Sequence, residues 1–208
     1  MRIIAPLAPA SVKSIEEMID GALSHVVWQL NQHLRRTFLL EEDFAVLSNI
    51  VEQDGALVPL VANKVVVFLV GIERETAAHS STEHAKAGSS DAVHWVEPVF
   101  LNLLVMCAAN FGGANYSEAL KLLSGAIGFF QINAVLDHHN CPELDDRVER
   151  ISFEIENLGL DQLHNLWGIH SGRYIPSVLY RVRMVSVDPN QANWRIPLIQ
   201  QTENNVCS

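Results

Sequence analysis

Apolar side chains recur every three or four residues in two long stretches of the chain, which is the spacing of one helix face. The first stretch predicts a helix over residues 15–36, through Ile15, Met18, Ile19, Ala22, Leu23, Val26, Val27, Leu30 and Leu34. Ser14 and Glu17 have the spacing of a capping box at its start. The second stretch predicts another helix, through Ala119, Leu122, Leu123, Ala126, Ile127 and Phe130. Asn115 and Glu118 form a variant capping box before it.

Shorter segments have the patterns of β-strands. We expect strands over residues 44–51, 64–76, 99–109, 150–158 and 177–187. The second and third are nearly unbroken apolar runs, as in strands buried on both faces, whereas the fourth and fifth alternate between apolar and polar residues. Between the last two strands, Asp161 predicts the start of a short third helix that ends near Gly168.

The order of these elements predicts an α+β fold, with a single mixed or antiparallel sheet and helices packed on one face. Residues 14–188 would form the single domain. We expect residues 1–13 to be an N-terminal arm and residues 189–208 to be an extended C-terminal tail, since both contain prolines. Residues 77–92 contain no large apolar side chain, which predicts a mobile loop or a segment that orders only against a partner.

Strand phase also predicts one set of contacts. In residues 177–187, Val178, Tyr180, Val182 and Met184 fall on one face, whereas Arg181 and Arg183 fall on the other. If this strand pairs antiparallel with residues 150–158, then Glu154 and Glu156 share the face of the two arginines. This hypothesis gives the guanidinium groups carboxylate partners within the fold and leaves a contact with another chain open.

Composition and charge exclude several classes of partner. Hydrophobic residues make up 49% and charged residues 18% of the chain. The core is therefore ample, and the surface has fewer solvating groups than usual. The 14 basic and 24 acidic residues give a formal net charge of −10. This charge argues against nucleic acid and anionic membranes as partners. Three scattered cysteines without a CxxC motif indicate no disulfide framework.

Candidate chemistry is sparse. His138, His139 and Cys141 lie close together, followed by Glu143 and Asp145, but the spacing matches no HExxH or paired-ligand motif. Residues 112–113 are a Gly-Gly pair that forms either an anion-binding nest or, as we favour, a simple strand-to-helix turn. No GxSxG motif and no evident acid–base pair of carboxylates is present. We therefore expect no catalytic residue, no metal and no cofactor, with a metal-dependent hydrolase as the alternative.

Several motifs, taken in order, resemble one protein family. They are MID at residues 18–20, QDG at 53–55, IERE at 72–75, NYSEALK at 115–121, FFQ at 129–131, LW at 166–167 and YIPSVLYRVR at 174–183. Together they resemble the tail-terminator, or cap, proteins of phage-tail-like contractile injection systems of the antifeeding-prophage and Photorhabdus virulence-cassette type. The chain departs from this pattern by starting well before Met18. Residues 1–17 are either an additional arm or precede the natural start.

The resemblance implies a structural role. Such proteins form a hexameric ring at the distal end of the tail, bind the inner tube and the outer sheath, stop polymerisation and hold the sheath extended. It also implies assembly in the bacterial cytoplasm, followed by incorporation into the particle, without nucleic-acid binding or membrane insertion. The family contributes no catalytic residues. Our candidates for the ring or capping contact are Arg173, Tyr174, Arg181, Arg183, Glu154 and Glu156, and a particle-associated adaptor domain is a further alternative.

Overall fold

The computed structural model describes residues 18–52, 54–75, 99–145, 148–170 and 173–186. Within these ranges the chain forms one six-stranded mixed sheet with three α-helices, which confirms the predicted α+β fold. The expected N-terminal arm, the Ser14–Glu17 capping box, the loop at 77–92 and the tail at 189–208 lie outside the described residues.

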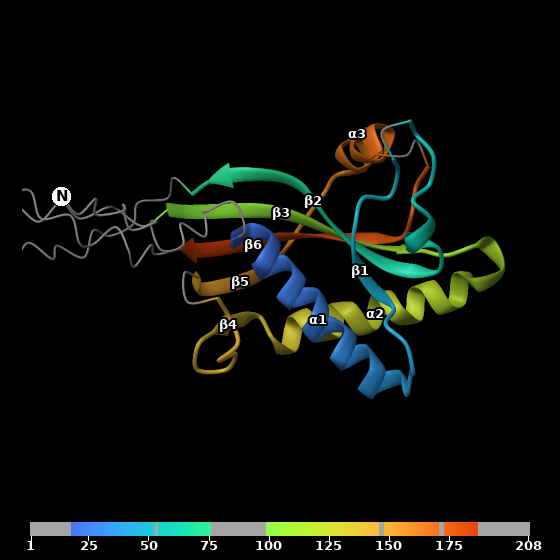
Figure 1. Cartoon of the computed structure of the whole chain (residues 1–208). Helices are drawn as coiled ribbons and strands as arrows, with labels where there is room; N and C mark the ends of the chain where they lie inside the picture. The colour runs from blue at the N-terminus through green and yellow to red at the C-terminus, as the bar shows by residue number, and fades with distance from the viewer. Residues whose placement is uncertain (1–17, 53, 76–98, 146–147, 171–172, 187–208) are drawn as a thin grey trace, which may run out of the picture.

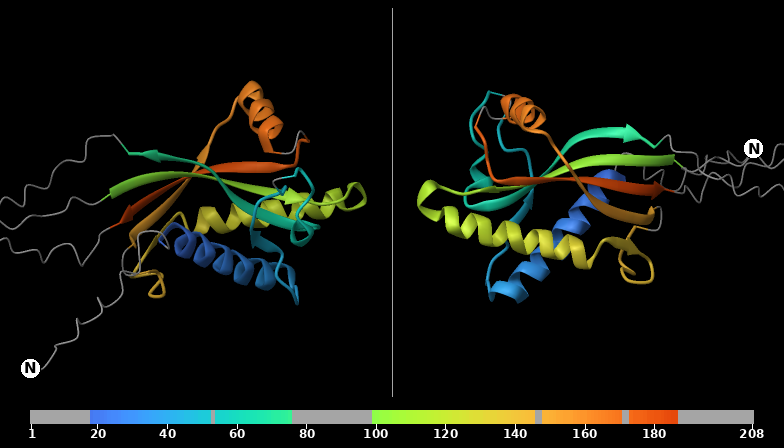
Figure 2. Two further views of the ribbon diagram at one scale, coloured as in Figure 1. Left: turned by 45° about the horizontal axis from the view of Figure 1, so that its top comes forward. Right: turned by 180° about the vertical axis from the view of Figure 1, so that it is seen from behind.

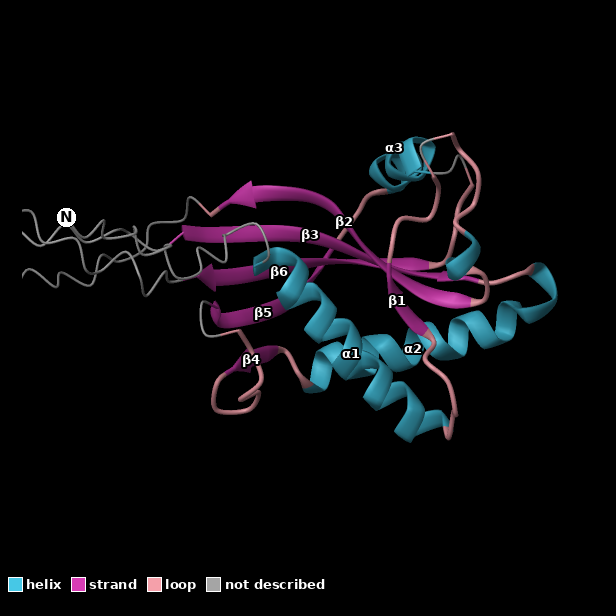
Figure 3. Cartoon of the chain, in the orientation of Figure 1, coloured by secondary structure: helices cyan, strands magenta, loops and turns pink. Residues whose placement is uncertain are grey.

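The sheet has the strand order β1-β2-β3-β6-β5-β4 (Figure 3). Its strands are β1 (Ala45–Leu47), β2 (Lys64–Arg74), β3 (Val99–Asn110), β4 (Val135–Asp137), β5 (Val148–Glu156) and β6 (Ser177–Ser186). The β1–β2 pair is parallel, and all other neighbours are antiparallel. The apolar runs in β2 and β3 place these strands inside the sheet, where both of their faces are covered along part of their length.

Two long helices cover one face of this sheet, which we call the helix face (Figure 1). They are α1 (Met18–Phe38) and α2 (Tyr116–Ile132). Their apolar stripes bury the side chains of Leu30 and Leu122 against alternate residues of β2, β3, β5 and β6. The two helices approach closely at Gly125, where an added Cβ atom would lie 2.6 Å from the Phe38 ring. This layer is the main hydrophobic core.

The third helix, α3 (Leu160–His170), lies on the opposite face of the sheet (Figure 2). Its Trp167 packs edge-on against Phe68 of β2, with ring centroids 6.5 Å apart. The expectation of helices on one face is therefore correct for α1 and α2 but not for α3. The physical reason is that β2 and β3 also present apolar side chains to this second face, and Trp167 covers them. We call this side of the sheet the α3 face.

Several element boundaries differ from those predicted. Strand β1 is confined to three residues of the longer predicted strand, because only these pair with β2. It is held by Asn31 of α1, whose amide donates to the Ala45 carbonyl and accepts from the backbone N–H groups of Phe44 and Ala45. The edge strand β4 was not predicted, since three residues carry too little pattern. Among the described residues, Asn115 makes no side-chain capping bond to α2, which begins instead after a 3₁₀ turn at Gly113–Asn115.

Candidate assembly surface

The antiparallel pairing of β5 with β6 brings the predicted acidic and basic side chains together. Glu154 lies directly opposite Arg181 in the register of these strands. The Arg181 Nε atom donates to Glu156 at 2.8 Å, and a guanidinium nitrogen of Arg183 lies 3.1 Å from a Glu154 carboxylate oxygen. The hypothesis drawn from strand phase is thus confirmed for all four side chains. They lie on the α3 face, beyond the part that α3 covers.

Two further carboxylates that we did not assign to this site come from the end of β2. Arg181 also donates to Glu73 at 2.6 Å, and the Nε atom of Arg183 lies 3.8 Å from Glu75. Strand β3 lies between β2 and β6, so these contacts reach across an intervening strand. The alternation of IERE at 72–75 shows the two acids on one face, but only the strand order identifies the arginines as their partners.

We call this group of Glu73, Glu75, Glu154, Glu156, Arg181 and Arg183 the charged strip. It carries four carboxylates and two guanidinium groups, a formal charge of −2. The carboxylates of Glu156 and Glu73 raise the pKa of Arg181 above its usual value, so this side chain stays charged throughout the physiological pH range. Most members are partly exposed: the Arg183 side chain has 48% of its surface accessible to solvent, and the Glu154 side chain has 55%. The strip is therefore available to a partner.

The structure places Arg173 and Tyr174 apart from the charged strip, in the turn between α3 and β6. Tyr174 is 60% exposed, and its ring packs edge-on against Trp167 with centroids 6.3 Å apart. The six candidate residues therefore form two separate groups rather than one. The first contains Glu154, Glu156, Arg181 and Arg183 in the open sheet, and the second contains Arg173 and Tyr174 beside α3.

The histidine and cysteine cluster has a structural explanation. Asp137 accepts hydrogen bonds from the backbone N–H groups of His139 at 2.9 Å and Asn140 at 3.1 Å. It therefore organises a turn, and these bonds lower the pKa of its carboxyl group. The Cys141 side chain is buried beside α1, with its Sγ atom 2.9 Å from His25 Nε2 and 3.2 Å from Gln29 Nε2. Burial raises the pKa of this thiol, which disfavours the reactive thiolate.

The described residues contain no group of three or more His, Cys, Asp or Glu side chains arranged to hold a metal ion. Gly112 and Gly113 lead into the 3₁₀ turn before α2, and the Gly112 N–H donates to the Asn63 side chain at 3.4 Å. A carboxylate, Glu118, lies in the first turn of α2. The strand-to-helix turn is thus the better explanation of the Gly-Gly pair. In the described part of the chain, no helix is both long and apolar enough to cross a membrane.

Comparison with known structures shows which class of protein has this fold. The anti-feeding prophage cap, described as a tube-terminating cap, is similar with a TM-score of 0.52 and 13% sequence identity over 89% of this chain. The match covers 59% of that cap, so the chain spans less than two thirds of its length. The sheath/tube terminator of the PVC extracellular contractile injection system in its extended state matches with a TM-score of 0.46 and 12% identity. That match covers 97% of this chain and 66% of the other.

The family is shown by the sequence itself. Residues 24–201 match the model of the Pvc16 N-terminal domain, so the chain belongs to this family. A comparison with curated proteins gave no match. The resemblance to tail terminators of contractile injection systems, first inferred from short motifs, is thereby confirmed.

Proposed function

We propose that the chain is a tail terminator that forms a ring, with six copies as the expected number, on the distal end of an inner tube and contractile sheath. It would end polymerisation and hold the sheath in its extended state. The observation that carries this proposal is the fold shared with a tube-terminating cap, together with membership of the Pvc16 N-terminal domain family. A terminator must cover the growing end of a polymer without offering an equivalent surface for the next subunit.

Its partners in this proposal are further copies of the chain, the tube protein and the sheath protein. The formal net charge of −10 favours basic patches on the tube or sheath, because opposite charges speed association and select partners. The charged strip and the turn with Arg173 and Tyr174 are the surfaces that we assign to these contacts. Assembly takes place in the bacterial cytoplasm, after which the protein remains part of the particle.

The proposed role is structural rather than enzymatic. Cys141, the most reactive residue type in the candidate cluster, is buried and paired with side chains of α1. The neighbouring Asp137 organises a turn. The hydrolase alternative predicts stoichiometric Zn²⁺ bound through His138, His139 and Cys141, and metal analysis of the purified chain tests it directly. We expect no bound metal.

Deletion of the protein, followed by electron microscopy of the particles, tests the terminator role. We expect absent, unstable or irregularly long tails, because polymerisation would lack its stop and the extended sheath would lose its cap. Supplying the wild-type chain from a plasmid should restore uniform tails. Tails of normal and uniform length in the deletion strain would refute the proposal.

The same strain tests the turn beside α3 with a matched pair of variants. Tyr174→Asp places a charge on this turn, whereas Tyr116→Asp places one on α2 at a tyrosine of similar exposure, 54% against 60%. We expect Tyr116→Asp to restore uniform tails and Tyr174→Asp to fail. Equal restoration by both variants would remove Tyr174 from the contact surface.

A further inference from the structure

The side of β2 that faces away from β3 is only partly covered. Strand β1 pairs with residues 65–67, and the Ser48 N–H extends this contact by donating to the Val67 carbonyl at 3.1 Å. In the described part of the chain, no strand lies beside residues 68–74 on that side. We call this stretch the open edge. Its exposure rises along the strand and reaches 51% at Ile72.

Backbone hydrogen-bonding groups point out of the open edge. The Glu75 N–H donates to the Phe100 carbonyl of β3 at 3.0 Å, so the backbone groups of Glu75 face β3. Successive residues of a strand direct these groups to opposite sides. Those of Arg74 and Ile72 therefore face the open side. An unpaired edge of this kind is a template for a further strand.

The side chains of the open edge define which strand fits beside it. Glu73 and Glu75 lie on the α3 face, where they belong to the charged strip, whereas Ile72 and Arg74 lie on the helix face. The strip has an excess of carboxylates, and the Glu73 side chain is 51% exposed. A complementary strand therefore places a basic side chain on the α3 face and large apolar side chains on the helix face.

Residues 194–198, WRIPL, have this alternation, with Arg195 between Trp194 and Ile196. We call them the tail segment. They lie within the range 24–201 that matches the family model. Arg2 also stands between apolar residues, but it precedes that match. The tail segment contains a proline, which is accepted in a strand at the edge of a sheet and not in its interior.

The position of β6 brings the tail segment within reach of the open edge. Strand β6 ends at Ser186, which pairs with Val99 at the start of β3, and β2 ends at the same end of the sheet (Figure 1). The open side of β2 lies three strand spacings from β6, or about 14 Å. Residues 187–193 span up to about 23 Å. A chain that crosses this distance and turns back runs antiparallel to β2.

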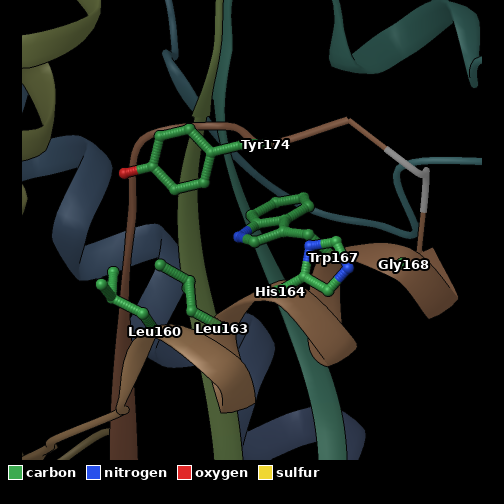
Figure 4. A pocket seen from close by; sticks show the side chains of 6 residues that line it. All are labelled: Leu160, Leu163, His164, Trp167, Gly168 and Tyr174. Carbon is green, nitrogen blue, oxygen red and sulfur yellow. The ribbon is translucent and has the colours of Figure 1, made fainter.

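The pocket beside α3 is a poorer site for the same segment (Figure 4). It has a volume of about 230 Å³, and its lining includes Leu163, Trp167 and Tyr174. Tyr174 precedes β6, whereas the chain leaves the sheet at the other end of this strand. The 10 residues of β6 separate the two ends by about 33 Å. The tail segment therefore starts much nearer to the open edge than to the pocket.

We propose that the tail segment forms an additional strand along the open edge of its own chain, with Arg195 opposite Glu73 and Ile196 opposite Ile72. In this register the backbone groups of Ile196 face those of Ile72, and the nitrogen of Pro197, which has no hydrogen to donate, faces away from β2. The added strand closes an edge that would otherwise accept a strand of another molecule. The contact lies within one chain, so it is independent of the proposed ring.

Disulfide formation in the full chain tests this register. Cys207 is replaced by Ser, and the two cysteines of the described chain remain because they are buried. Ile72→Cys and Ile196→Cys then lie directly opposite each other, at a Cα separation that a disulfide spans. The matched control combines Ile72→Cys with Pro197→Cys, one residue further along and on the other face. We expect mild oxidation to form an intramolecular disulfide at least tenfold faster in the first variant than in the control.

Equal rates in the two variants would overturn the proposed strand. Disulfide-linked dimers of the first variant, in place of the intramolecular product, would overturn its assignment to the same chain. Neither result bears on the terminator role, which the deletion strain tests.

Hydrogen exchange on the full chain without added cysteines provides a second test. The additional strand protects the amides of Ile72 and Arg74, and Ile196→Asp should make them exchange at least tenfold faster. The Val65 amide, which donates to the Phe44 carbonyl at 2.7 Å, is the internal control and should not change.

Two further variants give this exchange experiment its specificity. Arg195→Ala removes the charge beside Glu73 and should accelerate exchange at Ile72 several-fold, whereas Arg195→Lys should have a smaller effect. Val206→Asp, beyond the tail segment, should exchange like the wild-type chain. Rapid exchange at Ile72 in the wild-type chain, or no change with Ile196→Asp, would overturn the proposal.

Discussion

The two faces of the sheet differ in how completely they are covered. On the helix face, α1 and α2 bury an apolar layer that extends from Met18 to Met184, and the fully buried Leu30, Leu34 and Leu122 belong to it. On the α3 face, the apolar half is covered by α3 and by the segment between β1 and β2, which contributes the buried Ile50 and Val61, and the other half bears the charged strip. This difference indicates that the helix face specifies the fold, while the α3 face retains exposed charged groups, which we propose for contacts with partners.

Truncation of a buried leucine on the helix face should have the largest effect on stability. Leu30→Ala removes a side chain with no exposed surface and leaves a cavity. We expect a loss of about 3 kcal/mol in the free energy of unfolding, measured by urea denaturation. The control Ile169→Ala changes an 83% exposed residue of α3. It should alter stability by less than about 0.5 kcal/mol. Similar losses for the two variants would contradict the division between faces.

The next effect concerns a buried polar side chain of α1. Asn31→Ala leaves the backbone N–H groups of Phe44 and Ala45 and the Ala45 carbonyl without their side-chain partner. We expect a loss of about 2 kcal/mol, together with faster hydrogen exchange at the Ala45 amide. Asn49→Ala, at an exposed position, serves as the control. Unchanged exchange at Ala45 would show that β1 is held by other contacts.

Alkaline pH should weaken the helix-face core through Cys107. Burial raises the pKa of this thiol from 9.0 to about 12. Below pH 9 the thiol is protonated in both the folded and the unfolded chain, so the Cys107 thiol does not make stability depend on pH. Between pH 9 and 12 the thiol ionises only in the unfolded chain. Stability should therefore fall with rising pH, by about 1.4 kcal/mol at pH 10 from this group. Urea denaturation from pH 8 to 10 should show a flatter profile for Cys107→Ala than for the wild-type chain, and parallel profiles would contradict the assignment.

The charged strip should contribute least to folding. Its ion pairs are partly exposed. We therefore expect the double variant Arg181→Ala and Arg183→Ala to lose about 1 kcal/mol, with a smaller difference at high salt. The control Lys121→Ala breaks the exposed 3.2 Å pair with Glu118 on α2. It should change stability by a few tenths of a kcal/mol. If the strip contacts a partner, ring or particle assembly should weaken more than stability does. Unchanged assembly would confine the arginines to a role within the subunit.

Much of this architecture is predictable because long elements carry strong patterns. The helical spacing of α1 and α2 and the alternation of β5 and β6 identified these elements to within a few residues, and strand phase correctly placed Glu154 and Glu156 on the same face as Arg181 and Arg183. Strand β4 was missed because three residues at an edge have almost no periodicity. Periodicity also defines a helix's apolar stripe without revealing which face of the sheet receives it, which is why α3 was misplaced.

The missed part of the candidate site depends on strand order. Glu73 and Arg181 are far apart in sequence and belong to strands separated by β3. No local pattern identifies such a pair, since the second-neighbour relation exists only once the whole sheet is assembled.

The position of β6 also determines when the protein can finish folding. Although it is the last of the described strands along the chain, it lies in the middle of the sheet, between β3 and β5. Its pairing with β3 joins Val99 to Ser186 and Ala108 to Ser177, contacts between distant parts of the chain that form slowly. During synthesis, β1–β2–β3 and β4–β5 therefore remain as separate halves until residue 186 has left the ribosome. A nascent chain interrupted before this point lacks the strand that joins the halves, so we expect the domain to fold and take part in assembly only once β6 has been made.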